Sequence, residues 1–153
     1  MRALEPWVEP PLARFLAESS ARLVLLTTTA GQVIAQHGFT RAVDLMAAAA
    51  LGAAVIASTD ELGRITGGGP YRAVAHQGPG AGLHLAAIDL PHARWIGLVS
   101  FGRETSLGVV QVFFERMVGE LRSASPWEAP PRAVLAADFE RELGGSLQAL
   151  FGR

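Results

Sequence analysis

The chain has 153 residues, a formal net charge of −1, and a composition that is 50% hydrophobic and 18% charged. This length supports one domain with a single hydrophobic core, and this composition excludes a chain that is disordered throughout. Because acidic and basic residues nearly balance, the chain offers no basic field for a phosphate backbone, and a dedicated nucleic-acid-binding protein is not expected.

Two absent residue types narrow the chemistry further. The sequence contains no Cys and no Lys. It therefore offers no disulfide, no thiolate nucleophile, no Cys-ligated zinc and no lysine of the kind that holds phosphate in nucleotide-binding loops. The first eleven residues lack the apolar core of a secretory signal. We therefore expect a cytoplasmic protein.

The N-terminal part of the chain predicts a helix followed by a β-hairpin. Residues 10–18 begin with proline, which suits the first turn of a helix, and place their large apolar residues on one face. Two aliphatic runs follow, over residues 21–27 and 32–36, and a short loop with a glycine separates them. This pattern is typical of two strands joined as a hairpin.

The next segment predicts a long helix over residues 41–64, with Thr40 as its N-cap. Residues 45–57 are apolar on almost every side of that helix, yet they are too few to span a membrane, which takes about 20. Such a helix is expected to be buried on more than one face. Its second face is expected to pack against another copy of the chain. The alternative is a helix packed wholly within its own monomer.

Residues 67–70 comprise three glycines and a proline and are expected to end the long helix as a turn. Three strands are predicted next, over residues 71–76, 83–88 and 95–101, with a glycine-rich loop at 78–82 between the first two. A phosphate-binding loop takes a strand before it and a helix after it. Neither glycine-rich stretch has those neighbours, so both are expected to be turns.

A last core helix is predicted over residues 106–121, with Ser106 or the residue before it as N-cap. The folded domain is then expected to span residues 1–123, followed by a proline-rich linker at 124–132 and an amphipathic helix at 133–153. A helix this short is marginal alone in water. It should therefore dock either on its own core domain or on a partner.

The sequence contains no pattern that indicates a catalytic or metal site. His76 and His84 would face each other if residues 78–82 closed a regular hairpin, but two imidazoles without a third ligand make a weak metal site. No serine lies in a nucleophile-elbow pattern, and Asp60 with Glu61 is expected to be solvated surface charge. We therefore expect neither an enzyme nor a bound cofactor or metal ion.

The order helix, two strands, long helix, three strands, helix is typical of an α+β sandwich, here a five-stranded antiparallel sheet with helices packed on it. Residues 23–26 and 31–35 form the first hairpin, and an alanine-rich helix ends at residues 58–64. Residues 98–110 contain a strand and a polar turn that lead to Leu107-Gly108 at the start of a helix. In this order and spacing, these segments resemble the Roadblock/dynein light chain domain family, including its bacterial MglB-like members.

The resemblance covers residues 11–122 and implies a Roadblock-like sandwich that works as a homodimer without enzymatic activity of its own. In this family two protomers join through the third strand, here near residues 71–76, and pack their long helices together. The residues that this arrangement would bring to the dimer interface are Ala47, Ala50, Leu51, Ala54, Tyr71, Ala73 and Val74.

The family's dimers bind small Ras-like GTPases and modulate their nucleotide state, or serve as scaffolds. The resemblance therefore implies a small Ras-like GTPase as a partner, in addition to the second copy of the chain. Arg64, Arg72 and Arg103 are candidates for contacting that partner, one of them as an arginine finger that activates GTP hydrolysis. Two other functions stay open. One is a small-molecule sensor with its ligand between sheet and helix, and the other is a structural adaptor without effect on GTP turnover.

Overall fold

The computed structural model describes residues 2–3, 5–38 and 44–126. Its elements, in chain order, are β1 (Arg2–Ala3), the short 3-10 helix η1 (Pro6–Val8), α1 (Glu9–Ser19), β2 (Leu23–Thr28), β3 (Val33–Gly38), α2 (Leu45–Thr66), β4 (Ala73–Gln77), β5 (Ala81–Asp89), β6 (Arg94–Gly102) and α3 (Leu107–Ala124). From α1 onward this is the predicted order, which confirms the α+β fold. The predicted C-terminal helix over residues 133–153 and most of the linker before it lie outside the described residues.

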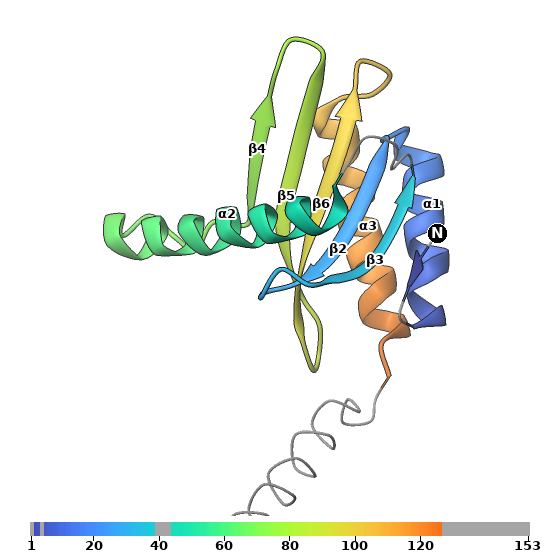
Figure 1. Cartoon of the computed structure of the whole chain (residues 1–153), viewed down its shortest axis with the longest axis horizontal. Helices are drawn as coiled ribbons and strands as arrows, with labels where there is room; N and C mark the ends of the chain where they lie inside the picture. The colour runs from blue at the N-terminus through green and yellow to red at the C-terminus, as the bar shows by residue number, and fades with distance from the viewer. Residues whose placement is uncertain (1, 4, 39–43, 127–153) are drawn as a thin grey trace, which may run out of the picture.

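The strands form one antiparallel sheet in the order β1-β3-β2-β6-β5-β4 (Figure 1). β2 to β6 are the five predicted strands. β1 adds a short edge strand that pairs Arg2 with Gln36 and Ala3 with Ala35. The sequence does not predict β1, because two residues are too few to show the alternation of a strand. The opposite edge is β4, which pairs with β5 alone.

Alternate strand residues point to opposite faces of the sheet and build two separate cores. On one face, Leu25, Leu85 and Leu98 pack with α2. On the other face, Val24 and Val99 belong to a larger cluster with the buried residues of α1 and α3. Figure 1 shows α2 crossing one face of the sheet while α1 and α3 lie on the other. The described part of the molecule therefore has three layers, of which α2 is one by itself.

Both long helices begin at polar caps. The Asp44 carboxylate accepts a hydrogen bond from the Ala47 N–H at 3.1 Å, so α2 begins at Leu45. The expected N-cap at Thr40 is therefore wrong, and Thr40 itself lies outside the described residues. Aspartate caps at least as well as threonine, and its negative charge also favours the positive end of the helix dipole. In α3, the Ser106 hydroxyl accepts from the Val109 N–H at 3.3 Å, which confirms the predicted cap.

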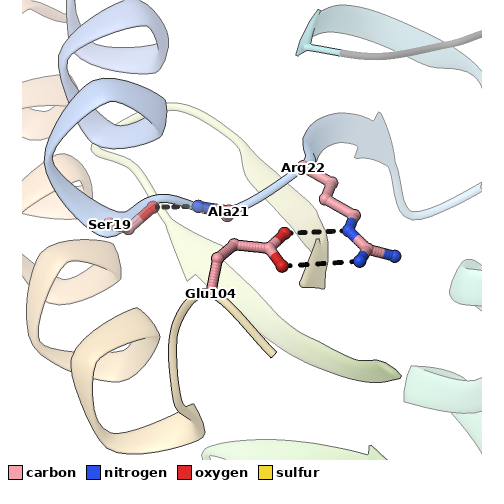
Figure 2. Close-up of polar contacts among 4 residues, drawn as sticks. All are labelled: Ser19, Ala21, Arg22 and Glu104. Carbon is pink, nitrogen blue, oxygen red and sulfur yellow. Dashed lines mark hydrogen bonds and ion pairs between the residues drawn. The ribbon is translucent and has the colours of Figure 1, made fainter. Parts of the chain in front are cut away.

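A salt bridge ties the start of β2 to the turn between β6 and α3 (Figure 2). Arg22 Nε donates to Glu104 Oε1 at 2.8 Å, and this hydrogen bond lowers the pKa of the Glu104 carboxyl. The Arg22 guanidinium lies against Gly102, where an added Cβ would collide with it. The same corner holds a hydrogen bond from the Ala21 N–H to Ser19 Oγ at 3.2 Å. These contacts hold the chain just after the end of α1 beside the turn that leads into α3.

Candidate interaction surface

α2 packs on the sheet through a narrow stripe of small side chains. Ala49, Gly52 and Ala53 are buried in this stripe. A Cβ at Gly52 would lie 3.3 Å from Leu98 Cδ1, so the helix sits close to the sheet. Because small side chains fill this contact, the core uses only a small part of the surface of α2.

The opposite face of α2 is apolar and exposed. Met46, Leu51, Leu62 and Ile65 are 79%, 68%, 57% and 65% exposed. Figure 1 shows the C-terminal half of α2 running out past β4, beyond the edge of the sheet. Monomeric soluble domains rarely expose large apolar side chains in a contiguous group unless something binds there. We call this surface the outer face of α2, defined by Leu51, Leu62 and Ile65, while the exposed Met46 lies at its flank, about 140° around the helix from Leu51.

α2 also has the length and composition of a membrane span, and 22% of its most apolar stretch is buried. Its sheet-facing side, however, covers a complete small core that includes Leu25, Leu85, Ile96 and Leu98. Moving α2 into a bilayer would expose those side chains to water at a large free-energy cost. The packing of α2 therefore favours a protein partner for its outer face.

The free edge of β4 lies next to the C-terminal end of α2. The Gly69 N–H donates to the Gly63 carbonyl at 3.3 Å, so the turn before β4 folds back on the helix. A Cβ at Gly63 would lie 3.4 Å from Tyr71 Cδ2, which places the Tyr71 ring over the same turns of α2. One edge of β4 has no strand partner among the described residues. An open strand edge of this kind can pair with another chain.

The structure places all seven predicted dimer-interface residues on these two elements or on the turn between them. Six of them are exposed in the single chain, and Val74 is half-buried. The core buries none of the seven completely, so each is available for a contact with another molecule. Their role in a dimer stays a prediction. Leu62 and Ile65 were not predicted as interface residues, although helical spacing alone could have placed them on the same exposed side as Leu51.

The three candidate arginines differ in what they already bind. Arg64 Nε donates to Glu61 Oε2 at 3.0 Å, and this hydrogen bond raises the pKa of Arg64 and lowers that of Glu61. Arg103 Nη2 donates to the Pro79 carbonyl at 3.2 Å. Within the described residues, Arg72 is exposed and has neither an ion pair nor a side-chain hydrogen bond.

The arginines do not form one cluster. Arg64 and Arg72 lie at the corner between α2 and β4, whereas Arg103 lies beside the turn that follows β4. A strand of this length separates the two ends by about 20 Å. Of the three, Arg72 therefore combines a free guanidinium with a position next to the outer face of α2.

The hairpin register does not bring His76 opposite His84. β5 begins at Ala81, so the loop is shorter than expected, and the register places Leu83 opposite His76 and Ala75 opposite His84. The two imidazoles therefore point to opposite faces of the sheet. His84 is buried against the edge of the Phe114 ring, with ring centroids 4.8 Å apart, and burial lowers its pKa. The described residues contain no group of three potential metal ligands.

Both glycine-rich stretches are turns, as predicted. Gly67 has a φ of +73° and ends α2 as its C-cap, a conformation that glycine adopts without strain. Gly78 closes the second turn by donating its N–H to the Ala81 carbonyl at 2.8 Å. Neither turn aims a row of backbone amides from the start of a helix, which is the arrangement that binds phosphate.

Several solved structures have a fold similar to that of this chain. No family model and no curated protein matches the chain. Among solved structures, MglB from Myxococcus xanthus superposes with a TM-score of 0.71 at 24% identity, over 78% of this chain and 95% of that chain. The gliding protein MglB from Thermus thermophilus superposes with a TM-score of 0.66 at 25% identity, over 78% and 88%.

A Roadblock/LC7 domain from Streptomyces avermitilis is also similar, with a TM-score of 0.65 at 19% identity, over 75% of this chain and 94% of that chain. In all three comparisons the shared part is nearly the whole length of the other protein. The similarity therefore concerns a complete domain. The resemblance seen in the sequence is confirmed, and the chain has the Roadblock-like fold of the MglB family.

Proposed function

We propose that two copies of this chain join through the outer face of α2 and the free edge of β4, and that the dimer binds a small Ras-like GTPase in the cytoplasm and modulates its nucleotide state. The observation that carries this proposal is the continuity of the two surfaces. The turn at Gly63 and Gly69 fixes the exposed apolar end of α2 beside the unpaired edge of β4.

A second copy suits this combined surface better than an unrelated ligand. A two-fold axis at the β4 edge would pair the two β4 strands and satisfy their open backbone groups. The same axis would bring the two α2 helices together, because each runs out past its own sheet edge (Figure 1). Leu51, Leu62 and Ile65 would then lose their exposure to water. One symmetric contact would thus pair the free edge of β4 and cover the outer face of α2.

The GTPase part of the proposal is supported by the fold shared with MglB proteins, and no glycine-rich turn in the described residues has the arrangement that binds nucleotide phosphate. The chain has no lysine and its glycine-rich turns have the wrong geometry for phosphate. It would therefore act through the partner's active site. Contacts that differ between the two nucleotide states of the GTPase would shift the population of its switch regions.

The proposal is tested in two steps. Sedimentation analysis of the full chain first gives its mass in solution, and a monomer at all concentrations contradicts the dimer. Tagged protein is then used to retain partners from the native lysate, in parallel with a non-hydrolysable GTP analogue and with GDP. A small GTPase retained in one nucleotide state supports the regulator and indicates its direction. Recovery of other proteins without a GTPase would instead favour the adaptor.

A further inference from the structure

A groove of about 780 Å³ lies on the helical layer opposite α2. Trp7 and Pro10 line it on the N-terminal side, and Arg116, Gly119 and Ala124 line it along the last turns of α3. The Trp7 ring is held in place by stacking on Trp95, with ring centroids 5.6 Å apart. The groove is therefore a formed surface with a fixed aromatic wall.

Gly119 is a helical glycine that the core does not need. A glycine in a helix costs about 1 kcal/mol relative to alanine. An added Cβ at Gly119 would meet no atom within 4 Å, so nothing among the described residues requires its small size. Its absence of a side chain keeps the groove open over the backbone of α3. A segment from outside the described residues that packed closely on the backbone at Gly119 would explain why this position has no side chain.

The position of the chain end provides such a neighbour. α3 ends at Ala124, on the wall of the groove, and the described residues stop at 126. The remaining 27 residues, 127–153, follow directly. The seven residues 126–132 can reach at most about 25 Å when extended. This tether is long enough for the following segment to turn back along α3, and it keeps that segment near the groove at high effective concentration.

The sequence of that segment matches the groove in apolarity and supplies carboxylates. Phe139, Leu143 and Leu147 are spaced four residues apart, which places them on one face if the segment is helical. Residues 133–153 contain three acidic residues, Asp138, Glu140 and Glu142, and two arginines, Arg141 and Arg153.

The rim of the groove carries two arginines, each already paired with a glutamate. Arg14 binds Glu120 at 2.7 Å and Arg116 binds Glu18 at 2.9 Å. Each guanidinium has five N–H donors, so both arginines keep donors for a further carboxylate. Glu120 also has a buried oxygen, Oε2, with no hydrogen-bond partner among the described residues.

We propose that residues 133–153 fold back and dock as an amphipathic helix in this groove of their own chain, with the apolar stripe against Trp7 and the backbone at Gly119. The contact lies on the layer opposite the outer face of α2. It therefore does not overlap the surface of the proposed dimer.

Disulfide trapping in the full chain tests the proposal, since the natural sequence has no Cys to interfere. Gly119→Cys is combined in turn with F139C, L143C and L147C. The matched control places the helix cysteine at Gly108, where an added Cβ also meets no atom within 4 Å. Gly108 lies eleven residues before Gly119, which is three helical turns and about 16 Å away on the same face of α3.

If the tail docks as proposed, at least one pair with Cys at position 119 forms an intramolecular disulfide about tenfold faster than the same tail cysteine paired with position 108. Non-reducing electrophoresis separates intramolecular from intermolecular products. Equal rates at the two helix positions overturn the proposal. Predominantly intermolecular disulfides at position 119 also overturn it, and assign the groove to a second copy.

Discussion

The N–H of Gly69 donates to the carbonyl of Gly63 at 3.3 Å, across the turn that leads from α2 into β4. A Cβ at position 69 would lie 2.8 Å from Gly63 Cα, a separation that atoms of this kind do not tolerate. The two glycines therefore let two backbones touch. This contact sets the angle between the exposed end of α2 and the free edge of β4, on which the proposed dimer depends.

Gly69→Ala is expected to weaken the dimer more than it weakens the fold. The methyl group must push the turn away from α2, which costs about 1–3 kcal/mol of contact energy at that corner. Gly108→Ala is the control, because a Cβ there meets no atom within 4 Å. Sedimentation equilibrium measures the dimer dissociation constant, and thermal unfolding measures the core. A dimer of unchanged affinity in Gly69→Ala would show that this corner does not set the interface.

Leu51→Glu is expected to dissociate the dimer, because it would bury a carboxylate in an apolar contact. Val112→Glu on α3 is a matched control, since Val112 is 64% exposed and Leu51 is 68% exposed. Ala54→Glu on the same helix should behave as Leu51→Glu does. Light scattering across a dilution series distinguishes the variants. If Leu51→Glu and Val112→Glu keep the same mass, the interface lies elsewhere.

Arg72→Ala is expected to reduce the effect of the dimer on the GTPase more than Arg64→Ala or Arg103→Ala does. Within the described residues Arg72 has no side-chain partner, whereas Arg64 is paired with Glu61 and Arg103 is bound to the Pro79 carbonyl. If Arg72 acts as an arginine finger, its loss lowers stimulated GTP hydrolysis by about 10³-fold or more, with the dimer intact. Single-turnover hydrolysis measures this loss. Full stimulation by Arg72→Ala would remove it from the active site.

The stability of the fold is expected to fall at mildly acidic pH because of His84. Burial beside Phe114 lowers the pKa of this imidazole from its ordinary value of 6.5. The unfolded chain then binds more protons than the folded chain below about pH 6.5, so the free energy of unfolding decreases as pH falls through that range. Above it, the contribution disappears. Denaturant unfolding at pH 7.5 and 5.5 should show a smaller pH difference in His84→Leu than in the natural protein.

His76→Leu provides the control for that comparison. His76 is exposed on β4 and lies opposite Leu83, on the other face of the sheet from His84. Its substitution should leave the difference in unfolding free energy between the two pH values unchanged. An equal response of both histidine variants would mean that burial of His84 is not the cause of the pH dependence.

Deletion of residues 127–153 is expected to leave a cooperatively folded domain. Both hydrophobic clusters are complete within the described residues, with α1 and α3 covering one sheet face and α2 the other. Loss of the docked tail should lower the unfolding temperature by only a few degrees, since one short helical contact contributes little beside two full cores. Thermal unfolding followed by circular dichroism measures this. A non-cooperative transition would show that the tail belongs to the core.

Most of the fold was predictable from the sequence because apolar runs bounded by turn residues mark the strands. Aliphatic runs of this kind correspond to β2, β3, β5 and β6, and the apolar spacing of residues 106–121 corresponds to α3. The start of α2 was not predictable to within a turn, since Thr40 and Asp44 are both good N-caps. In the folded chain Asp44 is the N-cap, and α2 begins where its small residues meet the sheet.

The candidate surface was predictable only in part. The alanine-rich composition of α2 indicated a second buried face, and the exposed positions of Ala47, Ala50 and Ala54 agree with that expectation. The register of β4 against β5 depended on whether Ala81 and Gly82 belonged to the loop or to the strand, a choice of two residues that moved His76 away from His84. The contact of Gly63 with Gly69 is set in three dimensions and has no periodic signal in the sequence.

β1 makes the two sides of the sheet unequal. By pairing with Gln36 and Ala35, Arg2 and Ala3 occupy the middle of the β3 edge, where a foreign strand would otherwise lie. A polymer of sheets needs two usable edges on every subunit. Among the described residues the sheet has two edges, the five-residue β4 and the two-residue β1, and β1 is too short to pair with a long foreign strand. Joining two β4 edges would leave only the short β1 edges, which favours a finite assembly over a fibre.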